Sequence, residues 1–322
     1  MPYLEQSTYK APGILTNTHV QTIYRAIFRR VRGFKYSERQ RIETPDNDFL
    51  DVDWIKVGGR KLVIALHGLA GNAKSTYITG LMRYASRMGW DGMGMNYRGC
   101  SGEVNRKLRS YHSGETEDLG FLLEYIQQHF DYEEIALVGF SLGGNVVLKY
   151  AGEQSDKISP RIGRVVAVSA PVHLESCSQQ LDKWYNKVYL IRFLRELKQK
   201  TYEKKHLSSG QINYEMVRRA NSFRQFDDAV TAPAHGFRDA KDYWNRASSL
   251  PYLSNIRVPS LLLNAWDDTF LGDPCYPIPI ARESPYFYLE TPTYGGHVGF
   301  LTFDGSGNYW TEKRVFEFIS GM

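Results

Sequence analysis

Length, composition and charge limit the kinds of protein that this chain can be. It has 322 residues, of which 42% are hydrophobic and 23% are charged, as in a globular protein with a sizeable core. The net charge of +5 is too weak to argue for nucleic-acid binding, and the sequence carries no nucleic-acid-binding motif. The three cysteines lie far apart without a C-x-x-C pair, which excludes a disulfide framework and a zinc site of the usual spacing.

Neither a secretory leader nor a membrane span is expected. The N-terminal sequence M-P-Y-L-E-Q-S-T-Y-K lacks a basic stretch followed by an apolar core. No apolar run approaches the roughly 20 residues that a membrane-spanning helix needs. Since the cysteine usage also fits a reducing compartment, we expect a cytoplasmic protein.

From about residue 50, short β-like runs alternate with helical segments in the chain. The first run, K-L-V-I-A-L at 61–66, is apolar throughout, as expected of a strand buried on both faces. Three further strands are predicted at 91–97, 135–140 and 164–170, with helices following the first three strands at 75–89, 115–130 and 142–153. This alternation predicts a mostly parallel sheet with helices on both faces.

The alternation stops at Pro171 and resumes late in the chain. Residues 172–250 contain helical, partly basic segments and no convincing strand. Strands are again predicted at 259–265 and 286–291, before a C-terminal helix. We therefore expect one discontinuous α/β core, formed by residues 1–171 and 251–322 with an N-terminal extension at 1–50. A helical lid at 172–250 would interrupt this core.

The strongest chemical signal is G-F-S-L-G at residues 139–143, which matches G-x-S-x-G. It follows a predicted strand and opens a predicted helix, which is the context of a nucleophile elbow. The sharp turn of an elbow projects the serine hydroxyl above the sheet, and the glycines keep side chains away from the neighbouring backbone. The pattern therefore predicts Ser141 as a nucleophile.

A serine nucleophile needs donors that stabilise the oxyanion formed when it attacks a carbonyl. The sequence H-G-L-A-G at 67–71 lies just after the first buried strand, where such a donor is expected. The backbone amides of Leu69 and Leu142 are the predicted pair. His67 is expected to order this loop rather than to act as a base.

The base and the acid of a triad should follow the nucleophile along the chain, the acid first. His297, in Y-G-G-H-V-G-F, is the histidine that comes after the last predicted strand, so it is the predicted base. The acid should follow the strand before it, where Asp267 and Asp268 are adjacent. Local chemistry does not choose between these two carboxylates.

Several long motifs in this chain resemble those of the YheT-like hydrolases, a branch of the α/β-hydrolase superfamily. They are N-T-H-V-Q-T (17–22), N-Y-R-G-C-S-G-E (96–103), R-S-Y-H-S-G-E-T-E-D-L (109–119), F-D-D-A-V-T-A-P-A-H-G-F (226–237) and Y-G-G-H-V-G-F. The resemblance implies a serine hydrolase of carboxylic esters, with Ser141 as nucleophile, His297 as base and Asp268 as acid. The chain departs from the family where Thr269 and Thr18 replace prolines.

The predicted activity needs no cofactor and no metal. The expected partner is a small ester with an apolar acyl chain, for which the lid aromatics Trp184, Tyr185, Tyr189 and Phe193 are suited. A Lys- and Arg-rich face on the lid predicts solvent exposure, and peripheral membrane contact is the alternative. Two other functions remain open: acyl transfer through the same triad, and non-catalytic binding on a hydrolase fold.

Overall fold

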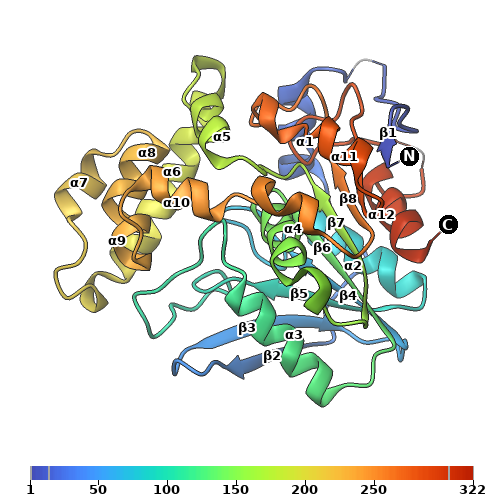
Figure 1. Ribbon diagram of the computed structural model, residues 1–322, viewed down its shortest axis with the longest axis horizontal. Helices are drawn as coiled ribbons and strands as arrows, with labels where there is room; N and C mark the ends of the chain where they lie inside the picture. Colours follow the sequence, from blue (N-terminus) through green and yellow to red (C-terminus); the bar gives the residue numbers. More distant parts are fainter. Residues whose placement is uncertain (1, 14, 304, 322) are drawn as a thin grey trace.

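The computed structural model describes residues 2–13, 15–303 and 305–321, and these form one twisted sheet flanked by helices (Figure 1). The strand order is β1-β9-β8-β7-β6-β4-β5-β3-β2. The first seven strands in this order, β1-β9-β8-β7-β6-β4-β5, pair parallel with their neighbours. The last two are antiparallel: β3 pairs with β5, and β2 pairs with β3. The strands are β1 (Tyr3–Leu4), β2 (Glu38–Glu43), β3 (Phe49–Ile55), β4 (Lys61–Leu66), β5 (Asp91–Asn96), β6 (Glu134–Phe140), β7 (Ile162–Val168), β8 (Ser260–Leu263) and β9 (Phe287–Glu290).

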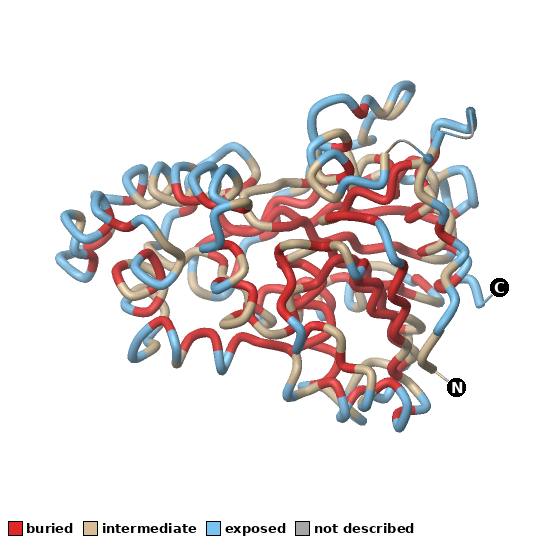
Figure 2. Tube along the Cα trace, turned by 90° about the horizontal axis from the view of Figure 1, so that it is seen from above, coloured by how far each residue is buried: buried red, intermediate tan, exposed pale blue. Residues whose placement is uncertain are grey.

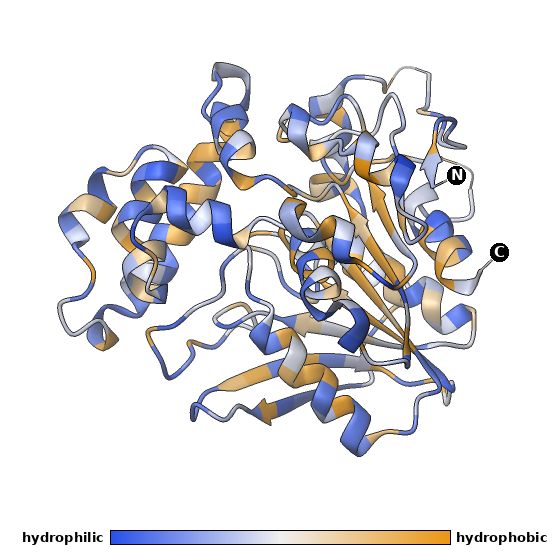
Figure 3. Ribbon diagram, in the orientation of Figure 1, coloured by the Kyte–Doolittle hydropathy of each residue, from blue (hydrophilic) through white to orange (hydrophobic). Residues whose placement is uncertain are grey.

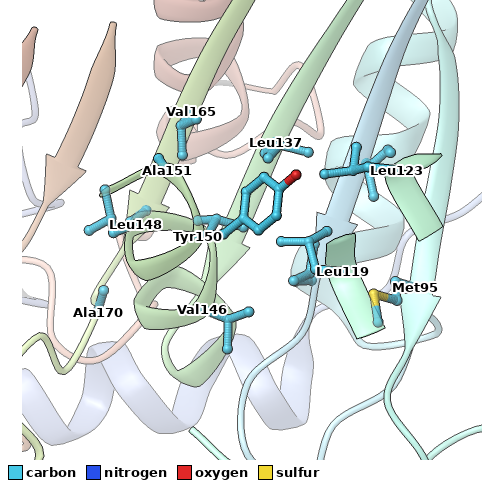
Figure 4. Packing of buried hydrophobic residues seen from close by; sticks show 14 of the residues in the cluster. Met95, Leu119, Leu123, Leu137, Val146, Leu148, Tyr150, Ala151, Val165 and Ala170 are labelled. Carbon is cyan, nitrogen blue, oxygen red and sulfur yellow. The ribbon is translucent and has the colours of Figure 1, made fainter. Parts of the chain in front are cut away.

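Helices cover both faces of the sheet because the central strands are apolar on both sides (Figure 3). One face carries α3 (Glu117–His129), α4 (Leu142–Gln154) and α11 (Ile278–Glu283). Figure 4 shows side chains of α3 and α4 meeting β6 and β7 on this face. The other face carries α2 (Thr76–Arg87) and α12 (Trp310–Ser320). The expected fold class, a mostly parallel sheet with helices on both faces, is confirmed.

Residues 172–250 contain helices and no strand, and all of them are described. Figure 1 shows most of these helices grouped to one side of the sheet, and Figure 2 shows that their outer turns are exposed while the sheet is buried. The α-helices are α5 (Leu174–Leu181), α6 (Lys187–Glu203), α7 (Tyr214–Arg219), α8 (Phe223–Phe226), α9 (Ala232–His235) and α10 (Ala240–Ala247). Between them lie the 3₁₀ turns η2 (Trp184–Asn186) and η3 (Lys205–Leu207) and the π-helical turn η4 (Asp227–Thr231). In the described part of the chain, no helix is long and apolar enough to cross a membrane.

The N-terminal region adds two strands and a helix to the fold, since β1, β2 and the helix α1 (Thr18–Phe28) lie within residues 1–50. The strand β2, E-R-Q-R-I-E, is an edge strand with one buried side chain, so it shows no apolar alternation. Its arginines instead form paired hydrogen bonds with carboxylates on β3, Arg39 with Asp53 and Arg41 with Asp51, at 2.8 to 2.9 Å. Cross-strand charge pairs hold this edge where hydrophobic burial does not.

Candidate active site

Ser141 occupies a strained turn between β6 and α4. Its φ of 52° and ψ of −120° lie in a region that side chains rarely adopt, and its amide donates to the carbonyl of Val168 on β7 at 2.8 Å. A Cβ at Gly139 would overlap the backbone of Gly143, and a Cβ at Gly143 would overlap the carbonyl of Leu66. The two glycines of G-x-S-x-G are therefore required by backbone contacts, as the elbow pattern predicts.

His297 lies between Ser141 and Asp268 in the structure. Its Nε2 is 2.8 Å from Ser141 Oγ, and its Nδ1 is 2.8 Å from Asp268 Oδ2. Asp268 is buried, and its second oxygen accepts the amide of Phe270 at 3.0 Å. Because Nδ1 donates its proton to the carboxylate, Nε2 is left as an acceptor for the serine hydroxyl. The ring of Phe270 stacks on the imidazole at a centroid distance of 4.3 Å and fixes its plane.

The neighbouring carboxylate, Asp267, has a different environment. Its Oδ1 accepts the amide of Gly296 at 2.9 Å, while its Oδ2 is buried without a hydrogen-bond partner among the described residues. Burial raises the pKa of Asp267 to about 6. Asp267 therefore holds the backbone of the histidine loop, and Asp268 is the carboxylate in contact with the imidazole.

The histidine loop is also held from outside the sheet, by α1. The amide of His297 donates to Thr22 Oγ1 at 2.9 Å, and the amide of Leu301 donates to Gln21 Oε1 at 3.1 Å. Arg25, buried on the same helix, donates to the carbonyl of Val298 at 2.8 Å. These contacts give the N-terminal motif N-T-H-V-Q-T a physical role that the residue pattern alone does not supply.

The loop that carries Leu69 is held by aromatic hydroxyls on either side. The amide of Gly68 donates to Tyr77 and that of Ala70 donates to Tyr111, both at 3.0 Å. The amides of Leu69 and Leu142, in contrast, have no hydrogen-bond partner among the described residues. These are the two N–H groups expected to face an oxyanion, and both residues line the same pocket as Ser141.

His67 orders this loop and is not placed to act as a base. It is fully buried, its Nδ1 lies 2.8 Å from the carbonyl of Gly68, and its Nε2 accepts the amide of Tyr97 at 3.3 Å. Burial lowers the pKa of His67 to about 3. The imidazole therefore stays neutral, with both nitrogens engaged by backbone groups.

The pocket over Ser141 and His297 is walled mainly by apolar side chains from residues 172–250. Among those residues are Leu174, Leu181, Phe193, Leu197, Phe226 and Val230. Of the four lid aromatics expected to meet an acyl chain, Phe193 lines this pocket. Trp184, Tyr185 and Tyr189 are not among its lining residues, and Trp184 is exposed to solvent.

Two asparagines connect the helical segment to the loops of the site. Asn186, at its start, donates to the carbonyl of Thr269 at 2.7 Å and accepts the Thr269 hydroxyl at 2.8 Å. Asn145, on α4, donates to the carbonyl of Ala247 and accepts the amide of Ser249, both at 2.8 Å. Thr269 therefore makes a contact between the loop that carries Asp268 and the helical segment.

One group of described residues has side chains suited to a metal ion: His112, Glu115 and His235, whose ligand atoms lie within 4.8 Å of one another. Glu115 already accepts from Arg109 at 2.8 Å, and His112 Nδ1 accepts the amide of Gly114 at 3.1 Å, which leaves the proton on Nε2. Burial holds the pKa of His112 well below its usual value and lowers that of His235 to about 4. We interpret His112 and His235 as neutral imidazoles on the pocket wall, and Glu115 as the ion-pair partner of Arg109.

The comparisons with known proteins agree with this architecture. A family model described as the alpha/beta hydrolase fold matches residues 61–302. The chain therefore belongs to the α/β-hydrolase family. It is 36% identical to YheT of Escherichia coli over 314 residues, which is 95% of this chain and 91% of YheT. It is thus a member of the YheT-like branch.

Other relatives are more distant. The chain is 30% identical to phospholipase ABHD3 of Mus musculus, over 81% of this chain and 65% of that protein. It is 27% identical to a monoacylglycerol lipase of Saccharomyces cerevisiae, over 86% of this chain and 62% of the yeast protein. An esterase of Pyrococcus furiosus superposes with a TM-score of 0.62 at 19% identity, covering 91% of this chain and 96% of the esterase, a likeness of fold alone.

Proposed function

We propose that this protein is a serine hydrolase that cleaves carboxylic esters through an acyl-enzyme on Ser141. The observation that carries the proposal is the continuous chain Ser141 Oγ, His297 and Asp268, joined by two contacts of 2.8 Å. A serine alcohol is a weak nucleophile without a base, and a histidine base works best when a carboxylate fixes its tautomer. Both requirements are met in one place above the sheet.

In the first half of the reaction, His297 Nε2 takes the proton of Ser141 as Oγ attacks the ester carbonyl. The imidazolium that forms is stabilised by the buried carboxylate of Asp268. The negative charge that develops on the carbonyl oxygen is stabilised by the amides of Leu69 and Leu142. The tetrahedral intermediate then collapses, and His297 returns the proton to the departing alcohol.

In the second half, water replaces the alcohol. His297 deprotonates a water molecule, which attacks the acyl carbonyl. The amides of Leu69 and Leu142 again stabilise the oxyanion that forms. Collapse of the second intermediate releases the carboxylic acid and returns the proton to Ser141. Every proton passes through His297 Nε2, so the distance of this atom from Ser141 Oγ controls both halves.

The substrate class follows from the pocket wall. Its apolar side chains fit an ester with an apolar acyl chain, and lipid esters are the substrates named for the phospholipase and monoacylglycerol lipase relatives. We take residues 172–250 as the lid of the pocket and residues 1–171 with 251–322 as the core. Peripheral contact between this lid and a membrane is part of the proposal.

A panel of p-nitrophenyl esters with short to long acyl chains tests the activity. We expect turnover that rises with acyl length and is abolished in Ser141→Ala. Ser254→Ala, which changes an exposed serine remote from the pocket, is the matched control and should retain wild-type rates. Absence of turnover across the panel in folded wild-type protein would reject the proposal. Product analysis with an added alcohol separates hydrolysis, which releases free acid, from acyl transfer.

A further inference from the structure

The helix α1 has its polar side turned inward and its apolar side turned outward. Gln21, Arg25 and Arg29 are buried, whereas Val20, Ile23, Ile27 and Phe28 are exposed, with Phe28 at 62% of its full area. A surface helix of a globular protein normally shows the opposite arrangement. Gln21 and Arg25 contact the histidine loop, and Arg29 pairs with Glu312 on α12. The outward apolar side chains belong to no hydrophobic cluster of the described residues.

A second exposed apolar stripe lies on η2 and α6. Trp184, Val188 and Ile191 are separated by four and three positions and so share one helical face, with exposures of 85%, 74% and 59%. The opposite side of α6 is conventional, since Leu190 and Leu194 are buried. A tryptophan as exposed as Trp184, at the end of an apolar stripe, is costly unless a partner covers it.

The helices that carry these two stripes, α1 and α6, are in contact. The Nδ1 atom of His19 on α1 lies 3.0 Å from the hydroxyl of Tyr189 on α6. Their rings stack at a centroid distance of 5.7 Å. His19 precedes Val20, and Tyr189 follows Val188. We call the combined set the apolar face. Its members are Val20, Ile23, Ile27, Phe28, Trp184, Val188 and Ile191. Single exposed apolar residues are normal on any protein, whereas this concentration in two adjoining helices indicates a binding surface.

The charges in the two stretches that carry the apolar face are mostly basic. Residues 17–32 contain four arginines and no acidic residue, and residues 183–195 contain two lysines, two arginines and no acidic residue. Six of these basic side chains are exposed: Arg30, Arg32, Lys183, Lys187, Arg192 and Arg195. Arg192 is paired with Glu196, and Asp182 borders the stretch, so the rim is cationic without being uniformly so.

An apolar centre with a cationic rim matches the chemistry of an anionic phospholipid surface. Apolar and aromatic side chains enter the boundary between headgroups and acyl chains, while Lys and Arg meet the lipid phosphates and carboxylates. A second copy of the chain fits less well, because a two-fold dimer would place this basic rim against itself. We propose that the apolar face docks the protein on anionic phospholipid membranes.

Tyr189, the neighbour of Val188 on α6, is connected to His297 by two ring contacts. Tyr189 packs edge-on against Phe270 at 4.8 Å, and Phe270 stacks on His297 at 4.3 Å. Phe193, on the same helix as Val188, lines the pocket. Docking therefore brings the lid and the pocket wall to the lipid surface. This relevance to catalysis rests on the proposed function, whereas the docking itself does not.

Co-sedimentation of the full chain with vesicles tests the inference. We expect wild-type protein to bind vesicles of phosphatidylcholine mixed with phosphatidylserine, and to bind phosphatidylcholine alone much more weakly. Phe28→Ser with Trp184→Ser should reduce binding to the mixed vesicles at least tenfold, and Lys183→Glu with Lys187→Glu about tenfold. The controls are the double variant Val57→Ser with Met216→Ser and the single variant Lys241→Glu. They change exposed residues elsewhere and should bind like wild type.

Three results would overturn the docking inference. In the first, wild-type protein does not bind anionic vesicles. In the second, variants of the apolar face that thermal unfolding shows to be folded bind as well as wild type. In the third, the protein self-associates and the same variants abolish the self-association. The last result would assign the face to a second copy of the chain. Ser141→Ala should bind vesicles like wild type, so loss of catalysis and loss of docking are distinguished.

Discussion

Thr22 and His297 are 275 positions apart in the sequence, yet the His297 amide donates to the Thr22 hydroxyl oxygen at 2.9 Å. The same hydroxyl donates to the carbonyl of Thr18 at 2.8 Å, so it is fixed on α1. A helix outside the sheet thus sets the position of the proposed base. The position of His297 depends on this contact as well as on its contacts with Ser141 and Asp268.

Replacing Thr22 tests its role as a positioning residue. Thr22→Val keeps the shape of the side chain and leaves the His297 amide without an acceptor, so we expect kcat to fall about tenfold with KM little changed. Thr22→Ser restores the hydroxyl and should recover most of the rate. The pH profile of kcat/KM should shift in the valine variant and match wild type in the serine variant. Equal rates and profiles for the two variants would remove Thr22 from the account.

The adjacent carboxylates should respond differently to the same change. Asp268→Asn removes the charge that stabilises the imidazolium and permits the wrong tautomer, so kcat should fall by about three to four orders of magnitude. Asp267→Asn keeps an oxygen for the Gly296 amide and should retain most of the activity. Steady-state kinetics on a soluble ester measure both. A larger loss in Asp267→Asn than in Asp268→Asn would reverse the assignment.

Asp267 should also make stability depend on pH. Burial raises its pKa in the folded protein from 3.8 to about 6, so the folded state binds this proton more tightly than the unfolded state. Its contribution to the free energy of unfolding therefore falls as the pH rises from about 4 to about 6. Asp267→Asn lacks this titration, so its Tm relative to wild type should increase across that range. A constant difference in Tm between pH 4 and 7 would contradict the assigned pKa direction.

Two glycines provide a matched test of the elbow. Gly139→Ala places a Cβ against the backbone of Gly143 and should lower the free energy of unfolding by more than about 2 kcal/mol. Gly120, within α3, has room for a Cβ at ordinary contact distance from Tyr150. Gly120→Ala should therefore raise the free energy of unfolding by about 0.5–1 kcal/mol. Chemical denaturation measures both variants. A tolerated alanine at position 139 would mean that the turn is not held as described.

The local patterns in this sequence predict the elbow and the parallel strands because both depend on neighbours in the chain. A few neighbouring residues are enough to recognise the glycines around Ser141 as an elbow and the apolar runs of β4 and β6 as buried strands. His297 could be selected by chain order, since the loops after parallel strands open at the same edge of the sheet. These features require no knowledge of distant contacts.

Other features depend on contacts that no local pattern encodes. Asp267 and Asp268 are adjacent and chemically identical, so their roles differ only through the turn that points one at the imidazole and the other at Gly296. The role of Thr22 requires α1 to pack on a loop at the opposite end of the chain. Trp184 looks like a pocket residue by composition, and only the packing of α6 shows that it faces solvent.

Labelling by a fluorophosphonate probe tests the central claim most directly, because the probe reacts with a serine only when a base activates it. We expect one covalent adduct, located on Ser141 by peptide mass spectrometry. The adduct should be absent in Ser141→Ala and formed far more slowly in His297→Ala. Failure of folded wild-type protein to react, or an adduct that persists in Ser141→Ala, would contradict the account.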